Sequence, residues 1–279
     1  MNLKNVFISF AILTCVTSQA WADSAVGVTH LIERGGRKIA FHVTRGTGET
    51  IVLDAGAGED ASYWNSVVPT IAEKTGATII TYDRAGSGGS EEAPGPWSAQ
   101  DEALDLEAGL TSLQVNSGVV IVAHSLAGEV ATYLVLRRPS WVHAAVLLDA
   151  SIPEFYTDEE IDRQEKSLAP MVSALKHAPT SAQSRQGLAM ASSFDAVSRA
   201  FHKIAWPSSV PAIVVVSEKT PFEAPEDARA WKAAAHVFVS KTQNRRFMLA
   251  VASSHDIAHD DSTVVVDAIC AALAVPANQ

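Results

Sequence analysis

The stretch that decides the fold is Val119-Val120-Ile121-Val122-Ala123-His124-Ser125-Leu126-Ala127-Gly128-Glu129-Val130-Ala131. It begins with four β-branched residues and no polar alternation, a pattern typical of a strand that is buried on both faces. From Leu126 to Arg138 the apolar residues fit one helix with a basic last turn. The stretch therefore predicts a buried strand that turns directly into a helix, with Ser125 at the turn.

Ser125 has an alanine two residues away on either side, Ala123 and Ala127. This is the small-x-Ser-x-small pattern of a nucleophile elbow, with alanine where glycine is usual. A flanking side chain larger than a methyl group would clash with the crossing backbone of such a tight turn. The turn pushes the serine hydroxyl out of the sheet and directs the first helical N–H groups at the atom that it attacks. The plainer alternative is a serine that only caps the helix.

Segments with strand and helix patterns alternate along most of the chain, which predicts an α/β fold with a mostly parallel sheet covered by helices. The expected strands are a hairpin over 28–44 and single strands over 50–54, 77–83, 119–122, 142–149, 211–218 and 245–252. The expected helices span 61–74, 98–113, 126–138, 225–241 and 262–274. Residues 151–208 carry helical patterns only, and an insertion of this size between two core strands is the usual form of a lid.

The first 22 residues have the pattern of a secretory signal peptide. Lys4 supplies a positive start, residues 6–16 form a short apolar run, and Ala20-Trp21-Ala22 is an A-x-A cleavage site. The run is too short for a membrane span, so no stable membrane anchor is expected. We expect cleavage after Ala22, a periplasmic or secreted protein, and a single domain over residues 23–279.

Charge and motif content narrow the class of partner. The formal net charge of −10 argues against nucleic acid or anionic lipid as a partner. The chain has no His/Cys cluster with metal-ligand spacing, so no metal site is expected. Gly86-x-Gly88-Gly89 has the wrong spacing for a dinucleotide fingerprint. The expected partner is a small molecule, and no cofactor is expected.

A serine nucleophile needs a base that takes its proton and a carboxylate that orients the base. His255 follows the last expected strand, which puts it at the same sheet edge as Ser125. Two acids are open, because Asp149 ends the strand after the elbow helix and Glu218 ends the next strand. Asp149 is the preferred acid and Glu218 the alternative. His124 is expected to point away from the hydroxyl and to pack.

An oxyanion needs two preorganised donors. One is expected to be the N–H of Leu126, at the start of the elbow helix. The other is expected in the loop after strand 50–54, where Ala57 lies between Gly56 and Gly58 and the backbone can approach a ligand closely. The alternative for these two glycines is an ordinary tight turn.

Five segments together resemble the α/β-hydrolase fold superfamily. They are Leu53-Asp54-Ala55-Gly56-Ala57-Gly58, Tyr82-Asp83-Arg84-Ala85-Gly86-Ser87-Gly88, His124-Ser125-Leu126-Ala127-Gly128, Leu147-Leu148-Asp149-Ala150-Ser151 and Ser254-His255-Asp256-Ile257. The order is that of the superfamily, and the start at Asp54-Ala55-Gly56 matches a subgroup of serine esterase-like hydrolases. The chain is also similar to serine-dependent esterases on mobile resistance elements, macrolide esterases among them. Ala123, Ala127 and Thr220 depart from the general pattern, and Thr220 stands where many members have the acid.

The resemblance implies a secreted serine hydrolase that cleaves a carboxylic ester or lactone through an acyl-enzyme. Ser125 would attack, His255 would carry the proton, Asp149 would orient His255, and Ala57 and Leu126 would hold the oxyanion. A macrolide antibiotic is the specific substrate that it suggests, with resistance as the outcome. An amidase or a carbon–carbon bond hydrolase would use the same triad, and a non-catalytic ligand-binding protein would use the same fold.

Overall fold

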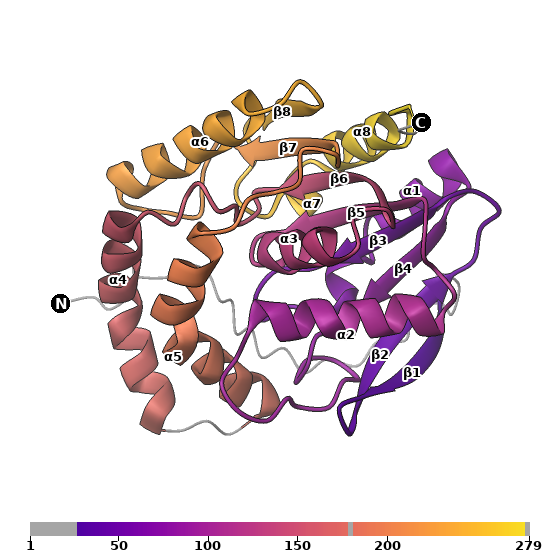
Figure 1. The fold of residues 1–279 in the computed structure, drawn as a ribbon. Coiled ribbons are helices and arrows are strands. Elements are labelled where there is room, and N and C mark those ends of the chain that lie inside the picture. The colour runs from indigo at the N-terminus through magenta and orange to yellow at the C-terminus, as the bar shows by residue number, and fades with distance from the viewer. Residues whose placement is uncertain (1–26, 178–180, 277–279) are drawn as a thin grey trace.

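The computed structural model describes residues 27–177 and 181–276 of the chain. The predicted signal peptide, residues 1–22, lies outside the described residues. Within them, a single sheet is covered by helices on both faces, and two long helices stand beside one edge of it (Figure 1). The predicted α/β-hydrolase architecture is confirmed.

The sheet has eight strands in the order β1-β2-β4-β3-β5-β6-β7-β8. They are β1 (Val28–Arg34), β2 (Arg37–Thr44), β3 (Thr50–Asp54), β4 (Thr78–Tyr82), β5 (Val119–His124), β6 (Val142–Leu148), β7 (Ala212–Ser217) and β8 (Arg245–Ala250). Pairs among β3 to β8 are parallel, and the β1–β2 and β2–β4 pairs are antiparallel. Gly35 and Gly36 both have positive φ, which makes the tight turn of the β1–β2 hairpin.

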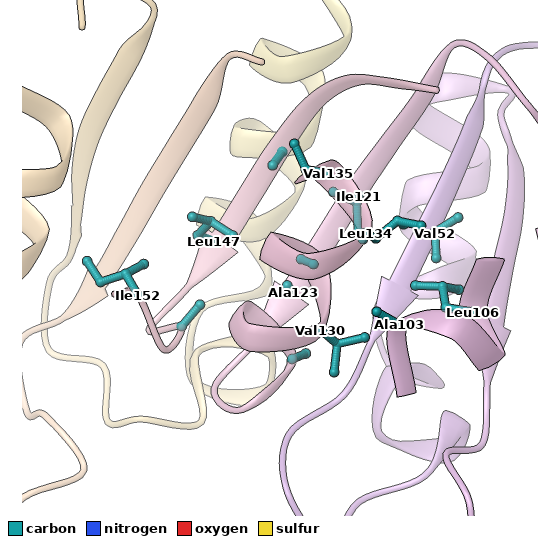
Figure 2. Packing of buried hydrophobic residues seen from close by; sticks show 14 of the residues in the cluster. Val52, Ala103, Leu106, Ile121, Ala123, Val130, Leu134, Val135, Leu147 and Ile152 are labelled. Carbon is teal, nitrogen blue, oxygen red and sulfur yellow. The ribbon is translucent and has the colours of Figure 1, made fainter. Parts of the chain in front are cut away.

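Helices cover the two sheet faces unequally. Their bounds are η1 (Ala61–Trp64), α1 (Val68–Thr75), α2 (Ala99–Ser112), α3 (Ala127–Arg137), α4 (Asp158–His177), α5 (Ala182–His202), α6 (Pro225–Ser240), α7 (Ile257–Asp260) and α8 (Ser262–Leu273). Residues of α2, α3 and α6 share one apolar cluster with the sheet, and residues of α1 and α8 share the other. Figure 2 shows Leu106 of α2 and Leu134 of α3 packed over Val52 and Ile121. All six residues of β5 are buried, because both clusters cover that strand.

The expected helix over 61–74 is wrong in its extent. The structure has a 3-10 turn, η1, in which Asp60 caps the N–H of Ser62, and then the separate helix α1. Pro69 lies in the first turn of α1, where its missing N–H costs nothing, but it cannot continue a helix from η1. The short helix α7, before α8, was not expected from the sequence.

The helical insertion between β6 and β7 consists of α4 and α5, which pack against each other. The start of α5 is tied to loops that follow β3 and β4. Gln183 Nε2 donates to Gly58 O at 2.5 Å, Gln186 Nε2 donates to Ala93 O at 2.9 Å, and Arg185 pairs with Glu92 at 2.5 Å. Over the described ranges, the helices include none with the length and apolar character to cross a membrane.

Candidate active site

Ser125 stands at the turn between β5 and α3, where its φ of 56° lies in the left-handed region. A non-glycine residue held there is strained, and such strain is typical of functional turns. Ser125 N donates to Leu148 O at 3.1 Å, and Ser151 N donates to Ser125 O at 2.8 Å. Ala123 and Ala127 are fully buried. The packed surroundings therefore leave no room for larger side chains on either side of the serine.

Three side chains from distant parts of the chain meet at the carboxyl ends of the strands. Ser125 Oγ lies 2.9 Å from His255 Nε2, and His255 Nδ1 lies 2.9 Å from Asp149 Oδ2. A proton on Nδ1 is donated to the carboxylate, which leaves Nε2 as the acceptor for the serine hydroxyl. The structure thus places the expected nucleophile, base and preferred acid in one hydrogen-bonded line.

The carboxylate of Asp149 is buried and surrounded by donors. Besides His255, it accepts hydrogen bonds from Ser217 Oγ at 2.6 Å, from Ser217 N at 3.2 Å and from Trp231 Nε1 at 2.9 Å. Burial by itself would raise the pKa of Asp149, but these hydrogen bonds outweigh it and hold the pKa below its ordinary value. The side chain therefore stays charged beside His255. Neither Ser217 nor Trp231 was expected from the sequence.

The alternative acid, Glu218, lies elsewhere. Its Oε2 accepts a hydrogen bond from Ala252 N at 2.6 Å, in an exposed position. Successive residues at the end of a strand point to opposite faces, so Ser217 faces Asp149 while Glu218 turns toward the loop after β8. The structure brings Asp149, and not Glu218, to His255.

Two backbone donors lie beside Ser125. The residues Ala57 and Leu126 both line the cavity next to the serine. Within the described residues, neither N–H donates a hydrogen bond to another protein group. The carbonyl of Gly56 accepts from the Arg84 guanidinium. Because C=O and N–H point in opposite directions across a trans peptide, this contact directs the N–H of Ala57 away from Arg84.

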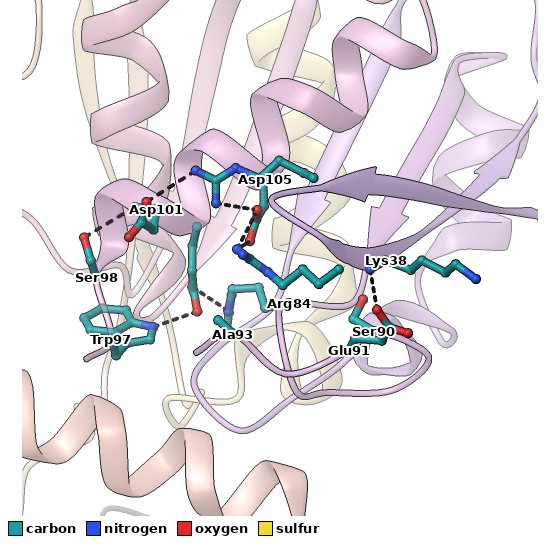
Figure 3. Close-up of polar contacts among 12 residues, drawn as sticks. Lys38, Arg84, Ser90, Glu91, Ala93, Trp97, Ser98, Asp101 and Asp105 are labelled. Atoms are coloured by element: carbon teal, nitrogen blue, oxygen red, sulfur yellow. Dashed lines mark hydrogen bonds and ion pairs between the residues drawn. The ribbon is translucent and has the colours of Figure 1, made fainter. Parts of the chain in front are cut away.

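Arg84 is the buried cation behind that loop. Its Nη1 donates to Asp54 Oδ1 and to Ala55 O, each at 2.5 Å, and its Nε lies 3.2 Å from Glu102 Oε2. Trp97 Nε1 donates to the other oxygen of Glu102 at 2.6 Å. Figure 3 shows Trp97 and Arg84 within this group of polar contacts. Burial raises the pKa of Glu102 to about 7 despite the nearby guanidinium. Arg84 therefore braces the loop after β3.

His124 packs, as expected, but it also makes polar contacts. Its ring stacks on Tyr63 with centroids 4.9 Å apart. Its Nε2 lies 3.0 Å from His255 O, and its Nδ1 lies 3.3 Å from Glu59 Oε2, which also accepts from Gly56 N at 2.8 Å. His124 therefore connects the backbone of His255 with the loop that carries Ala57. The position before the elbow serine was the only signal for this role.

A cavity of about 200 Å³ opens beside Ser125. Its walls come from the loop after β3, the first turns of α3, helices α4 and α5, and the segment after β7. Many of the lining side chains are apolar, among them Phe155, Leu168, Met171, Met190, Phe194 and Phe222. The lining also contains two carboxyl groups, Glu59 and Glu129, and no lysine or arginine from the described part of the chain. The lining therefore favours a largely apolar ligand that carries no negative charge.

Known proteins with similar sequences align with part of this chain. YqjL of Bacillus subtilis is 29% identical over 116 residues, which are 40% of this chain and 45% of that protein. A protein of Azorhizobium caulinodans named "Putative carbamate hydrolase RutD" is 29% identical over 115 residues, 41% of this chain and 42% of that protein. These alignments span less than half the length of the curated relatives.

Solved structures match over a larger share. A bromoperoxidase from Bacillus anthracis superimposes with a TM-score of 0.65 at 19% identity, over 88% of this chain and 99% of its own. The esterase EaEST from Exiguobacterium antarcticum gives a TM-score of 0.64 at 17% identity, also over 88% and 99%. At these identities the likeness establishes the fold. The family model described as the alpha/beta hydrolase family matches residues 51–270, a span that runs from β3 into α8 and holds Ser125, Asp149 and His255. The chain is therefore a member of the alpha/beta hydrolase family.

Proposed function

We propose that this protein is a serine-dependent hydrolase of carboxylic esters or lactones. The observation that carries the proposal is the line of hydrogen bonds from Asp149 through His255 to Ser125, with 2.9 Å at each step to the histidine. The serine lies on the wall of a largely apolar cavity, where a substrate carbonyl has access to it. A serine that only capped a helix would not require a hydrogen bond to a histidine that is itself bound to a buried carboxylate.

The geometry supports an acyl-enzyme route. Ser125 Oγ attacks the carbonyl carbon while His255 Nε2 takes the hydroxyl proton, and the N–H groups of Ala57 and Leu126 hold the oxyanion. When the tetrahedral intermediate collapses, the carbon–oxygen bond to the alcohol breaks and His255 returns the proton to the leaving oxygen. Water, deprotonated by His255, then releases the acid from Ser125. A lactone would open by the same steps, with the acid and alcohol left in one molecule.

In this proposal α4 and α5 act as a lid. They supply apolar side chains to the cavity, and Gln183 near the start of α5 contacts the carbonyl of Gly58 in the loop after β3. A lid that touches this loop would couple substrate entry to the position of Ala57. The predicted secretion of the protein through residues 1–22 remains part of the same proposal.

A macrolide antibiotic is the specific substrate that we propose, on the strength of the resemblance to macrolide esterases. The apolar lining of the cavity is compatible with a macrocyclic lactone. A carbamate is a second candidate, because a relative at 29% identity carries the name of a carbamate hydrolase. An amidase or a carbon–carbon bond hydrolase would need the same three side chains, so only turnover separates these reactions.

The first test is labelling with a fluorophosphonate probe. We expect wild-type protein to be labelled and Ser125→Ala to lose all labelling. Incubation of both proteins with a macrolide such as tylosin, followed by mass spectrometry, then asks whether the wild type alone adds one water. Cleavage of simple esters without change in the macrolide would keep the hydrolase and reject the macrolide. A wild-type protein that is neither labelled nor active would overturn the serine hydrolase and favour a non-catalytic ligand-binding protein or another chemistry.

A further inference from the structure

Glu129 is a buried carboxyl group that the proposed reaction does not use. It lies in the first turn of α3, the helix that starts beside Ser125, and the residue is 3% exposed. Its Oε2 has no hydrogen-bond partner within the described residues. The side chain nevertheless forms part of the wall of the cavity that contains Ser125. An unpartnered buried carboxyl oxygen is costly, so its presence at a ligand cavity needs an explanation.

The surroundings of Glu129 favour positive charge. The cavity is lined by two carboxyl groups and by no lysine or arginine from the described ranges. Six aromatic rings also line it, those of Trp97, Phe155, Tyr156, Phe194, Phe222 and Trp231. Aromatic faces attract cations, and the attraction strengthens where water is excluded. The net charge of −10 adds a long-range pull on cationic ligands.

We propose that Glu129 and the aromatic rings of this cavity form a subsite for an ammonium group, so that the enzyme prefers esters that carry a cationic nitrogen. This inference rests on the proposed serine hydrolase function. Ser125 and Glu129 are four residues apart in the chain, and both line the same cavity. The nitrogen would therefore stand a short spacer away from the scissile carbonyl.

The protonation of Glu129 makes the proposal testable. Burial raises the pKa of Glu129 to about 8, a hydrogen bond from Tyr156 lowers it, and the charge of Glu102 on α2 raises it further. Tyr133, one turn along α3, faces the same carboxyl. Near pH 7 the group is mostly neutral, and it becomes charged as the pH rises through 8. A cation that binds to the carboxylate displaces the proton into solvent, so its binding strengthens over the same range.

The experiment compares two esters of the same shape. Butyrylcholine carries a permanent positive charge, and 3,3-dimethylbutyl butanoate has carbon in place of the nitrogen. The measured quantity is the ratio of kcat/KM for the charged ester to kcat/KM for the neutral one, after the rate with Ser125→Ala is subtracted. Protonation of the catalytic residues acts on both esters and cancels in this ratio. Because the choline charge is permanent, only groups on the protein change the ratio with pH.

For the wild type, we expect the ratio to exceed one and to rise roughly tenfold between pH 7 and pH 9, in step with the ionised fraction of Glu129. Glu129→Gln should lower the ratio at pH 9 at least roughly tenfold and remove its dependence on pH. Asp267→Asn, which removes an exposed carboxylate on α8, should leave both unchanged. Tyr156→Phe removes the hydrogen bond that lowers the pKa of Glu129, so the rise should move to higher pH.

A ratio that stays flat with pH, or that Glu129→Gln does not change, overturns the ammonium subsite and leaves the serine hydrolase intact. A ratio that falls as the pH rises also overturns it, because Glu129 would then serve as a neutral hydrogen-bond donor. If neither ester is cleaved although Ser125 is labelled, choline is tested for its ability to protect Ser125 from the fluorophosphonate, in the wild type and in Glu129→Gln. No protection, or equal protection in the two proteins, rejects the subsite. Absence of labelling rejects the proposed function itself.

Discussion

Two buried carboxyl groups lie near Ser125, and they are supported in opposite ways. On the side of β6 and β7, Asp149 receives hydrogen bonds from His255, Ser217 and Trp231, and its pKa is lowered. On the side of α3, one oxygen of Glu129 has no partner among the described residues, and burial raises its pKa to about 8. Both residues are almost completely buried.

The difference teaches that burial alone does not decide the charge of a carboxyl group. Desolvation raises the pKa of both carboxyl groups, and hydrogen bonds to the carboxylate lower it. The number of donors that face each carboxylate decides which of these two effects prevails. Asp149 stays charged at neutral pH, which suits a group that stabilises a histidine cation. Glu129 can gain or lose its charge near neutral pH, which suits a group that answers to a ligand.

The largest effect should come from Asp149→Asn. The amide cannot accept a hydrogen bond from the Nδ1–H of His255 while it keeps the other contacts. His255 would then no longer be held in the tautomer with the proton on Nδ1, and its cation would no longer be stabilised. We expect kcat to fall about 10⁴-fold, while Glu218→Gln should change kcat less than about threefold, since Glu218 does not contact His255. Steady-state kinetics on one ester measure both. A larger loss of kcat in Glu218→Gln than in Asp149→Asn would show that the acid has been assigned to the wrong residue.

The two carboxyl groups should also differ in how they change stability with pH. The raised pKa of Glu129 means that the folded state binds more protons than the unfolded state between its ordinary value of 4.5 and about 8. The free energy of unfolding should therefore fall as the pH rises through this window, by roughly 4–5 kcal/mol from this group. Glu102 acts in the same direction up to about pH 7.

Chemical denaturation at several pH values between 5 and 8 checks this expectation. Glu129→Gln should flatten the slope, and Asp267→Asn should not. The stabilisation from Asp149 has the opposite sign: it is fully present above the ordinary value of 3.8 and is lost as the pH falls below it. Parallel curves for wild type and Glu129→Gln would mean that Glu129 is charged in the folded protein.

A smaller effect is expected from Arg84→Lys, which tests how the loop after β3 is held in place. Lysine keeps the positive charge but cannot donate to Asp54 and the carbonyl of Gly56 together. If this contact directs the N–H of Ala57, kcat should fall roughly 10-fold to 100-fold with less change in KM. Arg37→Lys is the matched control, because Arg37 makes a buried ion pair with Asp105, 2.6 Å long, away from the cavity.

Both lysine variants should lower the melting temperature. At a temperature at which both variants are folded, only Arg84→Lys should lower kcat. Equal kinetics in the two variants would reduce Arg84 to a structural ion pair without influence on the oxyanion donors.

The smallest effect is expected from Trp231→Phe. It removes one donor from Asp149 and leaves the contacts from His255 and Ser217. The pKa of Asp149 should rise, and kcat should fall about threefold to tenfold with the larger loss at low pH. Trp206→Phe is the control, because its buried Nε1 donates to Val210 O at 2.9 Å and does not reach Asp149. If the pH profile keeps its shape, Asp149 does not depend on the number of its donors.

Much of the fold could be predicted because its signals are local. The β-branched run before Ser125 and the alternation of strand and helix patterns depend on neighbouring residues, and they indicated a parallel sheet. The expected helix over 61–74 failed where local signals competed. Asp60 and Pro69 each start a new helical turn, and the apolar periodicity across them concealed the break.

The candidate site was predictable where chain order carried the information. Ser125 and His255 each follow a strand whose end is visible in the sequence. The choice between Asp149 and Glu218 was open, because it depends on which face of the sheet edge each residue takes, and a shift of one residue reverses that face. Ser217 and Trp231 carried no signal, since an ordinary serine and an ordinary core tryptophan have the same sequence context.

The sequence by itself determined the elbow, the family and the types of side chain that the site contains, because these depend on the order and local pattern of residues. Only the tertiary structure decided which of them meet. The pairing of β3 with β5 puts the loop of Ala57 beside Leu126, and the pairing of β6 with β7 puts Ser217 against Asp149. The charge of Asp149 and of Glu129 was decided in the same way, because desolvation and hydrogen bonding come from residues distant in the chain.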